Sequence, residues 1–123
     1  MSKLSARIFD LKDLESQVRS EWNFIVNKSD NATIYHSTLW NKIQADHYPN
    51  LSCKIIIVKL ADNPVGLMPF FIRKINSFEK ISISAPLETP YAGPITVSSL
   101  KSAEKNVVIN LLISNFESID SSI

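Results

Sequence analysis

The stretch CKIIIVKLADNPVGLMPFFIRK, residues 53–74, decides the fold of this chain. It opens with four consecutive β-branched residues, Ile55 to Val58, which make it too apolar for a strand with one wet face. This run predicts a central strand that is buried on both faces. Residues 61–64 (ADNP) are typical of a turn, because Asp and Asn form local side-chain hydrogen bonds and Pro fixes φ. The remaining residues return as a second strand, so the stretch predicts a β-hairpin.

Two residues in the second strand predict an irregular ladder. Gly66 has no side chain to pack and Pro69 has no N–H to donate, so we expect a bulge or an exposed edge there. Asn76 and Ser77 predict another turn. Apolar and polar residues then alternate through residues 78–85, which predicts a third strand with one buried face.

Upstream of the hairpin, the pattern predicts a short strand and two helices. We expect the strand at residues 5–9, a first helix capped by Asp10 and ended by the polar run 27–31, and a second helix capped by Ser37 and closed by Pro49. Their apolar stripes are Leu11, Leu14, Val18, Trp22 and Ile25 in the first helix, and Leu39, Trp40, Ile43 and His47 in the second. Both tryptophans lie on these stripes, so we expect them in the core.

A third helix is predicted after the last strand. Ser98 or Ser99 is its expected cap, and its stripe is Leu100, Ala103, Val107 and Leu111, widened by Val108 and Leu112. The order of elements predicts an α+β (mixed α/β) domain: two helices, an antiparallel meander, then a helix packed on the sheet. A meander and helix normally lead to a further strand, so residues 1–123 are expected to form one domain or the amino-terminal part of one, which would be truncated.

Composition and charge exclude several classes of function. Thirteen basic and 12 acidic residues give a net charge of +1 without a run of like charges, so we expect no direct nucleic-acid partner. No segment has the roughly 18 apolar residues of a membrane span and the start is unlike a signal peptide, so we expect a cytoplasmic protein. The single cysteine excludes an internal disulfide and fits a reducing compartment.

Few residues predict chemistry by type and spacing alone. His36, His47 and Cys53 are not paired as zinc ligands are, so we expect no metal site. Gly66 and Gly93 lie too far apart for a phosphate-binding loop. Cys53 heads an apolar strand, which favours a buried, inert thiol over a nucleophile. We therefore assign no catalytic residue.

The rigid segment LETPYAGPI, residues 87–95, is the best candidate for a binding surface. Two prolines and Gly93 fix its backbone, so the ring of Tyr91 must point in a definite direction. Glu88 and Thr89 belong to the same loop. The loop is a candidate substrate-binding wall. The competing interpretation is a tight strand-to-helix corner, in which Glu88 is simply solvated.

Three short motifs follow one another along the chain. They are Tyr35, His36 and Trp40, then Val65, Gly66 and Pro69, then Tyr91, Gly93 and Pro94. Their order resembles the amino-terminal half of the FemAB-like and related GNAT-type acyltransferases, and the match covers roughly residues 33–112. Ala92 stands where that family usually has glycine.

The resemblance implies a transferase that moves an acyl or aminoacyl group from coenzyme A or charged tRNA to an amine, often in cell-envelope synthesis. The family's carrier-binding segment, Gln/Arg-x-x-Gly-x-Gly/Ala, follows the matched part and does not occur in these residues. It follows that no cofactor is expected to bind this chain, and catalysis by the chain alone is not expected. The predicted substrate-binding residues are Tyr91, Gly93, Glu88, Thr89 and His36.

The implied partners are a small-molecule, peptide or sugar amine and either the carboxy-terminal remainder of the same protein or a second copy. Two alternatives stay open. One is a stand-alone noncatalytic module that binds or assembles by dimerising through an open sheet edge. The other is a noncatalytic relic of the family, with the fold but no carrier binding.

Overall fold

The computed structural model describes residues 3–74, 80–83 and 93–120. The elements are, in order, β1 (Leu4–Asp10), the 3₁₀ turn η1 (Leu11–Asp13), α1 (Ser16–Lys28), the 3₁₀ turn η2 (Ile34–His36), α2 (Thr38–His47), β2 (Leu51–Leu60), β3 (Asn63–Lys74), β4 (Lys80–Ile83), β5 (Ile95–Thr96) and α3 (Ser102–Asp120). None of the helices in these ranges is long and apolar enough to cross a bilayer.

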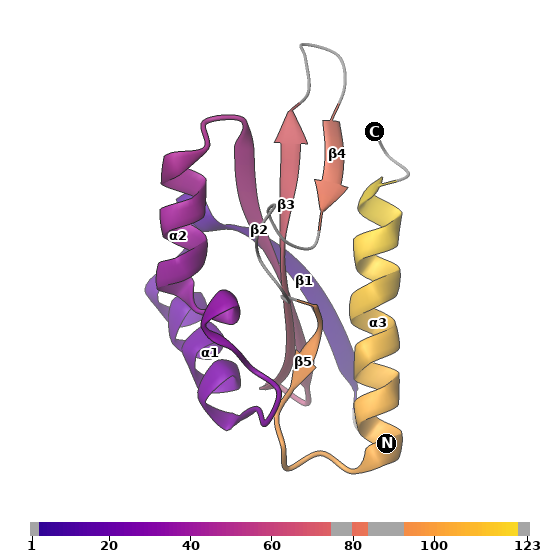
Figure 1. Ribbon diagram of the computed structural model, residues 1–123. Coiled ribbons are helices and arrows are strands. Elements are labelled where there is room, and N and C mark those ends of the chain that lie inside the picture. The colour runs from indigo at the N-terminus through magenta and orange to yellow at the C-terminus, as the bar shows by residue number, and fades with distance from the viewer. Residues whose placement is uncertain (1–2, 75–79, 84–92, 121–123) are drawn as a thin grey trace.

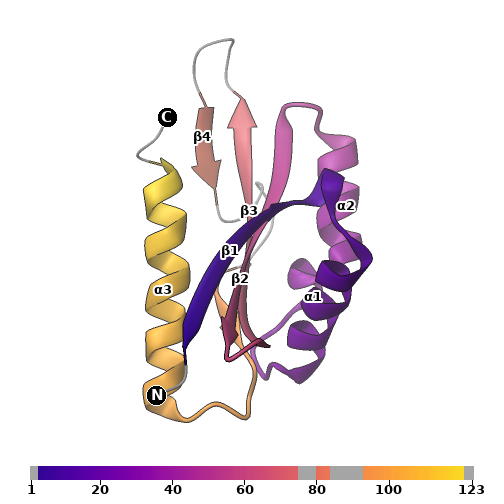
Figure 2. The same cartoon turned by 180° about the vertical axis from the view of Figure 1, so that it is seen from behind.

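The strands form one antiparallel sheet in the order β1-β2-β3-β4, and β5 pairs with β3 at the other end of that strand from β4. Helices α1 and α2 cover one face, while α3 packs along the other (Figures 1 and 2). Burial on both faces explains why Ile55 to Val58 are all buried in β2. The predicted α+β architecture, with two helices, a meander and a helix on the sheet, is confirmed.

The β2–β3 hairpin forms at the predicted place but with a tighter turn. Leu60 pairs with Asn63, so only Ala61 and Asp62 form the turn, and Asn63 already belongs to β3. Both turn residues have positive φ, 49° and 71°. Two consecutive positive φ values are typical of the turn whose twist matches that of paired strands.

Gly66 marks the predicted irregularity in β3. Val58 pairs with Gly66 but Lys59 pairs with Pro64, so Val65 is the extra residue of a bulge. A Cβ atom at Gly66 would overlap with Cγ1 of Val108 in α3. The absence of a side chain therefore lets α3 approach the sheet closely.

Pro69 lies in β3 between the residues that pair with β5 and those that pair with β4. At this point β3 has only β2 as a strand neighbour among the described residues. Its missing N–H is tolerated there because no second ladder needs it.

The first helix starts later than predicted. The side chain of Asp10 accepts a hydrogen bond from Lys12 N and caps η1, not the helix. The backbone is extended again at Leu14 and Glu15, and α1 begins only at Ser16. Its buried residues Val18, Trp22 and Ile25 belong to the predicted stripe.

The predicted stripe of α2 is wrong. Leu39 and Ile43 are 66% and 49% exposed, and the residue that α2 buries is Asn41, at 1%. Asn41 is satisfied there because its Nδ2 donates to the carbonyls of Tyr35 and Ser37, at 3.0 and 2.8 Å. Because these hydrogen bonds satisfy the amide, α2 can bury Asn41 and leave Leu39 and Ile43 exposed.

The stripe of α3 is rotated from the predicted one. Val107 is 52% exposed, while Val108 and Leu112 are fully buried against the sheet. The close approach at Gly66 explains the rotation, because the space beside that glycine accepts Val108. Of the two tryptophans, Trp22 is fully buried as predicted, and Trp40 is partly buried.

Candidate functional site

His36 joins two segments that are far apart in sequence. Its Nε2 lies 3.0 Å from the carbonyl oxygen of Gly93, just before β5, and its Nδ1 lies 3.0 Å from Thr33 N. Because Thr33 N can only donate, Nδ1 accepts, and Nε2 therefore carries the proton that it donates to Gly93. Trp22 Nε1 completes the arrangement by donating to the carbonyl of His36 at 2.7 Å.

The environment of His36 favours the neutral ring. Burial lowers the pKa of His36 below its ordinary value, and this outweighs the opposing effect of the hydrogen bond to Gly93. A proton added on Nδ1 would also face the N–H of Thr33. Both ring nitrogens are therefore engaged in hydrogen bonds with the backbone, and we assign His36 a positioning role for Gly93, just before β5.

The structure brings together two of the five predicted substrate-binding residues, His36 and Gly93. Glu88, Thr89 and Tyr91 lie outside the described residues. Their roles stay predictions.

Trp40 presents an unsatisfied donor beside this arrangement. Its ring packs edge-to-face on Tyr35, with the centroids 5.1 Å apart. Its Nε1 is buried and has no acceptor in the part of the chain that the structure describes. A buried N–H without a partner costs about 1–3 kcal/mol, and the described residues do not offset this cost.

Cys53 occupies the position expected for an inert thiol. It is buried, and burial raises the pKa of its thiol far above the ordinary value. Its sulfur lies 3.8 Å from Oδ1 of Asn41. The described residues contain no cluster of three or more His, Cys, Asp or Glu side chains that could hold a metal ion.

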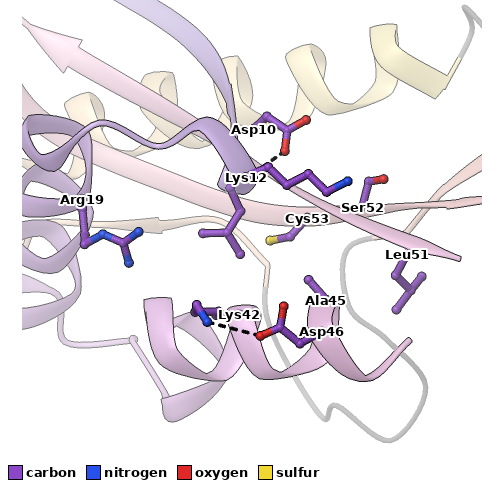
Figure 3. Close-up of a pocket in the computed structure, with 10 residues that line it drawn as sticks. Asp10, Lys12, Arg19, Lys42, Ala45, Asp46, Leu51, Ser52 and Cys53 are labelled. Atoms are coloured by element: carbon purple, nitrogen blue, oxygen red, sulfur yellow. Dashed lines mark hydrogen bonds and ion pairs between the residues drawn. The ribbon is translucent and has the colours of Figure 1, made fainter. Parts of the chain in front are cut away.

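A second feature is a cavity of about 220 Å³ between η1, α1, α2 and the start of β2 (Figure 3). Leu11, Ala45, Leu51 and Cys53 supply its apolar lining.

Charged side chains surround this lining. The acids are paired: Asp10 binds Lys54 at 2.7 Å, and Asp46 binds Lys42 at 3.3 Å. Although burial raises the pKa of Asp10, its hydrogen bonds with Lys54 and Lys12 N outweigh this effect and lower it, so the carboxylate stays ionised.

The guanidinium of Arg19 extends from α1 toward the cavity (Figure 3). It forms no hydrogen bond or ion pair with any described residue. Lys12 likewise lines the cavity without an ion pair in the described ranges.

Sequence reasoning did not find the cavity or Asn41. Arg19 follows Val18 at the border of the first helical stripe, and Asn41 is a single amide between apolar residues. Neither has a spacing that distinguishes it from an ordinary surface residue. Only the tertiary arrangement identifies them.

Comparison of the chain with protein-family models, with curated proteins and with solved structures gives no match.

Proposed function

We propose that this chain supplies the acceptor-side part of an N-acyltransferase of the FemAB-like or GNAT type. Such an enzyme would act on a small-molecule, peptide or sugar amine in the cytoplasm. The acyl donor would be acyl-CoA or aminoacyl-tRNA. Its binding site would be provided by a carboxy-terminal part of the same protein or by a second copy.

The hydrogen bond between His36 and Gly93 is the observation that carries the proposal. It joins two of the three segments on which the resemblance rests, although they are 57 positions apart. The third segment lies beside them, because Val97 N donates to Val65 O at 2.9 Å and β5 pairs with Gly66 and Leu67. Motifs that form one arrangement support a common function better than motifs scattered over the surface.

In the proposed reaction the amine nitrogen attacks the donor carbonyl. The C–N bond forms, the C–S or C–O bond to the carrier breaks, and the proton that the amine loses ends on the departing thiol or hydroxyl of the carrier. Positioning supplies much of the rate of such a transfer, so a fixed loop matters more than a nucleophile on the protein. The contribution of His36 would be to hold the loop end, and that of Trp40 Nε1 to donate to an oxygen of the acceptor substrate.

The test uses the gene product that carries residues 1–123, with whatever follows Ile123. Release of free CoA from acyl-CoA, and of free tRNA from aminoacyl-tRNA, is measured with a panel of amines, for the unmodified protein and for Trp40→Phe and Tyr91→Ala. Trp40→Phe keeps the ring and removes the donor. We expect each variant to lower kcat/KM at least about tenfold, equivalent to about 1.4 kcal/mol. Val107→Ala, an exposed change on α3, is the matched control.

Unchanged kinetics in both variants would remove Trp40 and Tyr91 from the acceptor site. Absence of transfer with every amine and donor, together with a stable dimer in light scattering, would instead favour the assembly module. The outer edge of β1 would then be the first surface to examine, because β1 pairs only with β2 in the described part of the sheet.

A further inference from the structure

We propose that the cavity between η1, α1, α2 and β2 binds a small monocarboxylate with a short apolar body, with its carboxylate on Arg19. This site is separate from the acceptor site proposed above and does not depend on the acyltransferase proposal. It rests on the charge, shape and lining of the cavity.

The pairing of the charged groups selects an anion. Asp10 and Asp46 are already paired with Lys54 and Lys42, whereas Arg19 has no acidic partner among the described residues and Lys12 forms no ion pair with them, although its charge also acts on Asp10. A cationic ligand would face these two unpaired cations. A carboxylate instead gains charge-assisted hydrogen bonds, because the planar guanidinium matches its two oxygens.

The lining selects an apolar body of limited length. The apolar part of the lining consists of carbon and sulfur atoms of Leu11, Ala45, Leu51 and Cys53. The charged side chains that line the cavity surround this part. At about 30 Å³ per water, a cavity of about 220 Å³ holds roughly seven waters, and hence a ligand with about the same number of non-hydrogen atoms. Displacing water from this lining adds hydrophobic stabilisation for each buried methylene.

The lining also disfavours a phosphate. Its apolar part, formed by Leu11, Ala45, Leu51 and Cys53, offers a phosphate no hydrogen-bond donors, whereas the alkyl chain of a carboxylate needs none. The distribution of charge and apolar surface therefore fits a monoanion with a polar end and an apolar end.

The experiment titrates the isotopically labelled chain with sodium carboxylates of two to eight carbons and records amide chemical shifts. Inorganic phosphate and the amine and amide analogues of the best carboxylate serve as comparison ligands. We expect saturable shifts at Leu51, Ser52 and Cys53, and tightest binding at an intermediate chain length. We expect no saturable shifts of these amides with the amine or the amide.

Arg19→Gln tests the assigned contact, and we expect it to raise the dissociation constant of the carboxylate at least tenfold. Arg73→Gln removes the same charge from an exposed position on β3 and should leave binding unchanged. Ala45→Phe should abolish binding by filling the cavity. The ligand series on the unmodified chain does not depend on the folding of any variant.

Three results would each overturn the proposal. The first is the absence of saturable shifts at the start of β2 with every carboxylate up to 10 mM, roughly the weakest affinity worth assigning to a site. The second is tighter binding of phosphate than of any carboxylate. The third is equal affinity of the unmodified chain and a folded Arg19→Gln variant.

Discussion

At the scale of single residues, His36 connects the helical layer to Gly93, just before β5, through a hydrogen bond. It is fully buried and bonded at both ring nitrogens. The sequence alone makes His36 a candidate substrate-binding residue. Its hydrogen bonds in the structure instead connect Thr33 to Gly93. Its protonation state must therefore affect the stability of the fold.

We predict an acid-sensitive stability that depends on His36. Burial holds its folded-state pKa below the unfolded value of about 6.5, so the unfolded chain binds the proton more readily. The contribution of neutral His36 to the free energy of unfolding is complete above pH 6.5. It is lost as the pH falls below 6.5, with a limiting slope of about 1.4 kcal/mol per pH unit. Urea unfolding between pH 7.5 and 5 measures this slope.

The variant His36→Asn, in which the amide oxygen can still accept from Thr33 N, should flatten this dependence at the cost of the bond to Gly93. His47→Asn changes an exposed histidine on α2 and should keep the slope. If the free energy of unfolding depends on pH in the same way for the unmodified protein and for His36→Asn, a group other than His36 is responsible.

Sequence reasoning succeeded where apolar patterning decides the structure and failed where a buried amide or a missing side chain decides it. The run Ile55 to Val58 indicated a strand buried on both faces, and β2 is that strand. The exposed faces of α2 and α3 were misassigned because α2 buries the hydrogen-bonded amide of Asn41, and because α3 packs Val108 against Gly66 of a distant strand. Neither the amide network nor the space beside a glycine leaves a periodic signal.

The same limit applies to the site. The motif containing His36 and the loop containing Gly93 were found in sequence, and the structure joins them. The cavity was not found, because its residues come from five separate elements. A charge without a partner, such as that of Arg19, is visible only once all neighbours are placed.

At the scale of elements, the packing of α3 on β3 depends on one missing side chain. A Cβ at Gly66 would overlap with Val108 Cγ1 and lie 3.3 Å from Leu112 Cδ1. Gly66 has no positive φ, so substitution there is opposed by the helix and not by the backbone. The two elements fit because a glycine faces a β-branched residue.

We predict that Gly66→Ala destabilises the protein by about 1–3 kcal/mol, the usual cost of overpacking a core. Val108→Ala removes the overlapping atom and should recover part of this loss in the double variant, with a coupling energy of at least about 0.5 kcal/mol. Urea unfolding of all four proteins measures the cycle. Val107→Ala, on the exposed side of the same helix, should show no coupling with Gly66→Ala. If the effects of Gly66→Ala and Val108→Ala are additive, the contact between these two residues is contradicted.

At the scale of the whole molecule, Cys53 reports on global opening. It lies under α2 at the head of β2, buried in the core shared by the sheet and the first helical layer. Cys53 lines the cavity described above, so a disulfide reagent that is too large for this cavity can reach the sulfur only when these layers separate. Burial also raises the pKa of the thiol, which removes the reactive thiolate from the folded state.

We predict that the thiol reacts with a disulfide reagent only as fast as the protein opens. The rate should rise with urea in proportion to the population of the open state. A Ser20→Cys variant, exposed on α1, should in contrast react at once and show little dependence on urea. Rapid labelling of Cys53 without urea would show that α2 detaches locally.

The pairing of β1 has a consequence for the order of synthesis. Leu4 pairs with Leu60, so the first strand meets its partner only after 56 more residues have been made. At the usual 5–20 residues per second, this takes about 3 to 11 s on the ribosome. The strands β3, β4 and β5, by contrast, each emerge after a strand with which they pair. The nascent chain therefore carries β1 for seconds with its backbone hydrogen-bonding groups open to other chains.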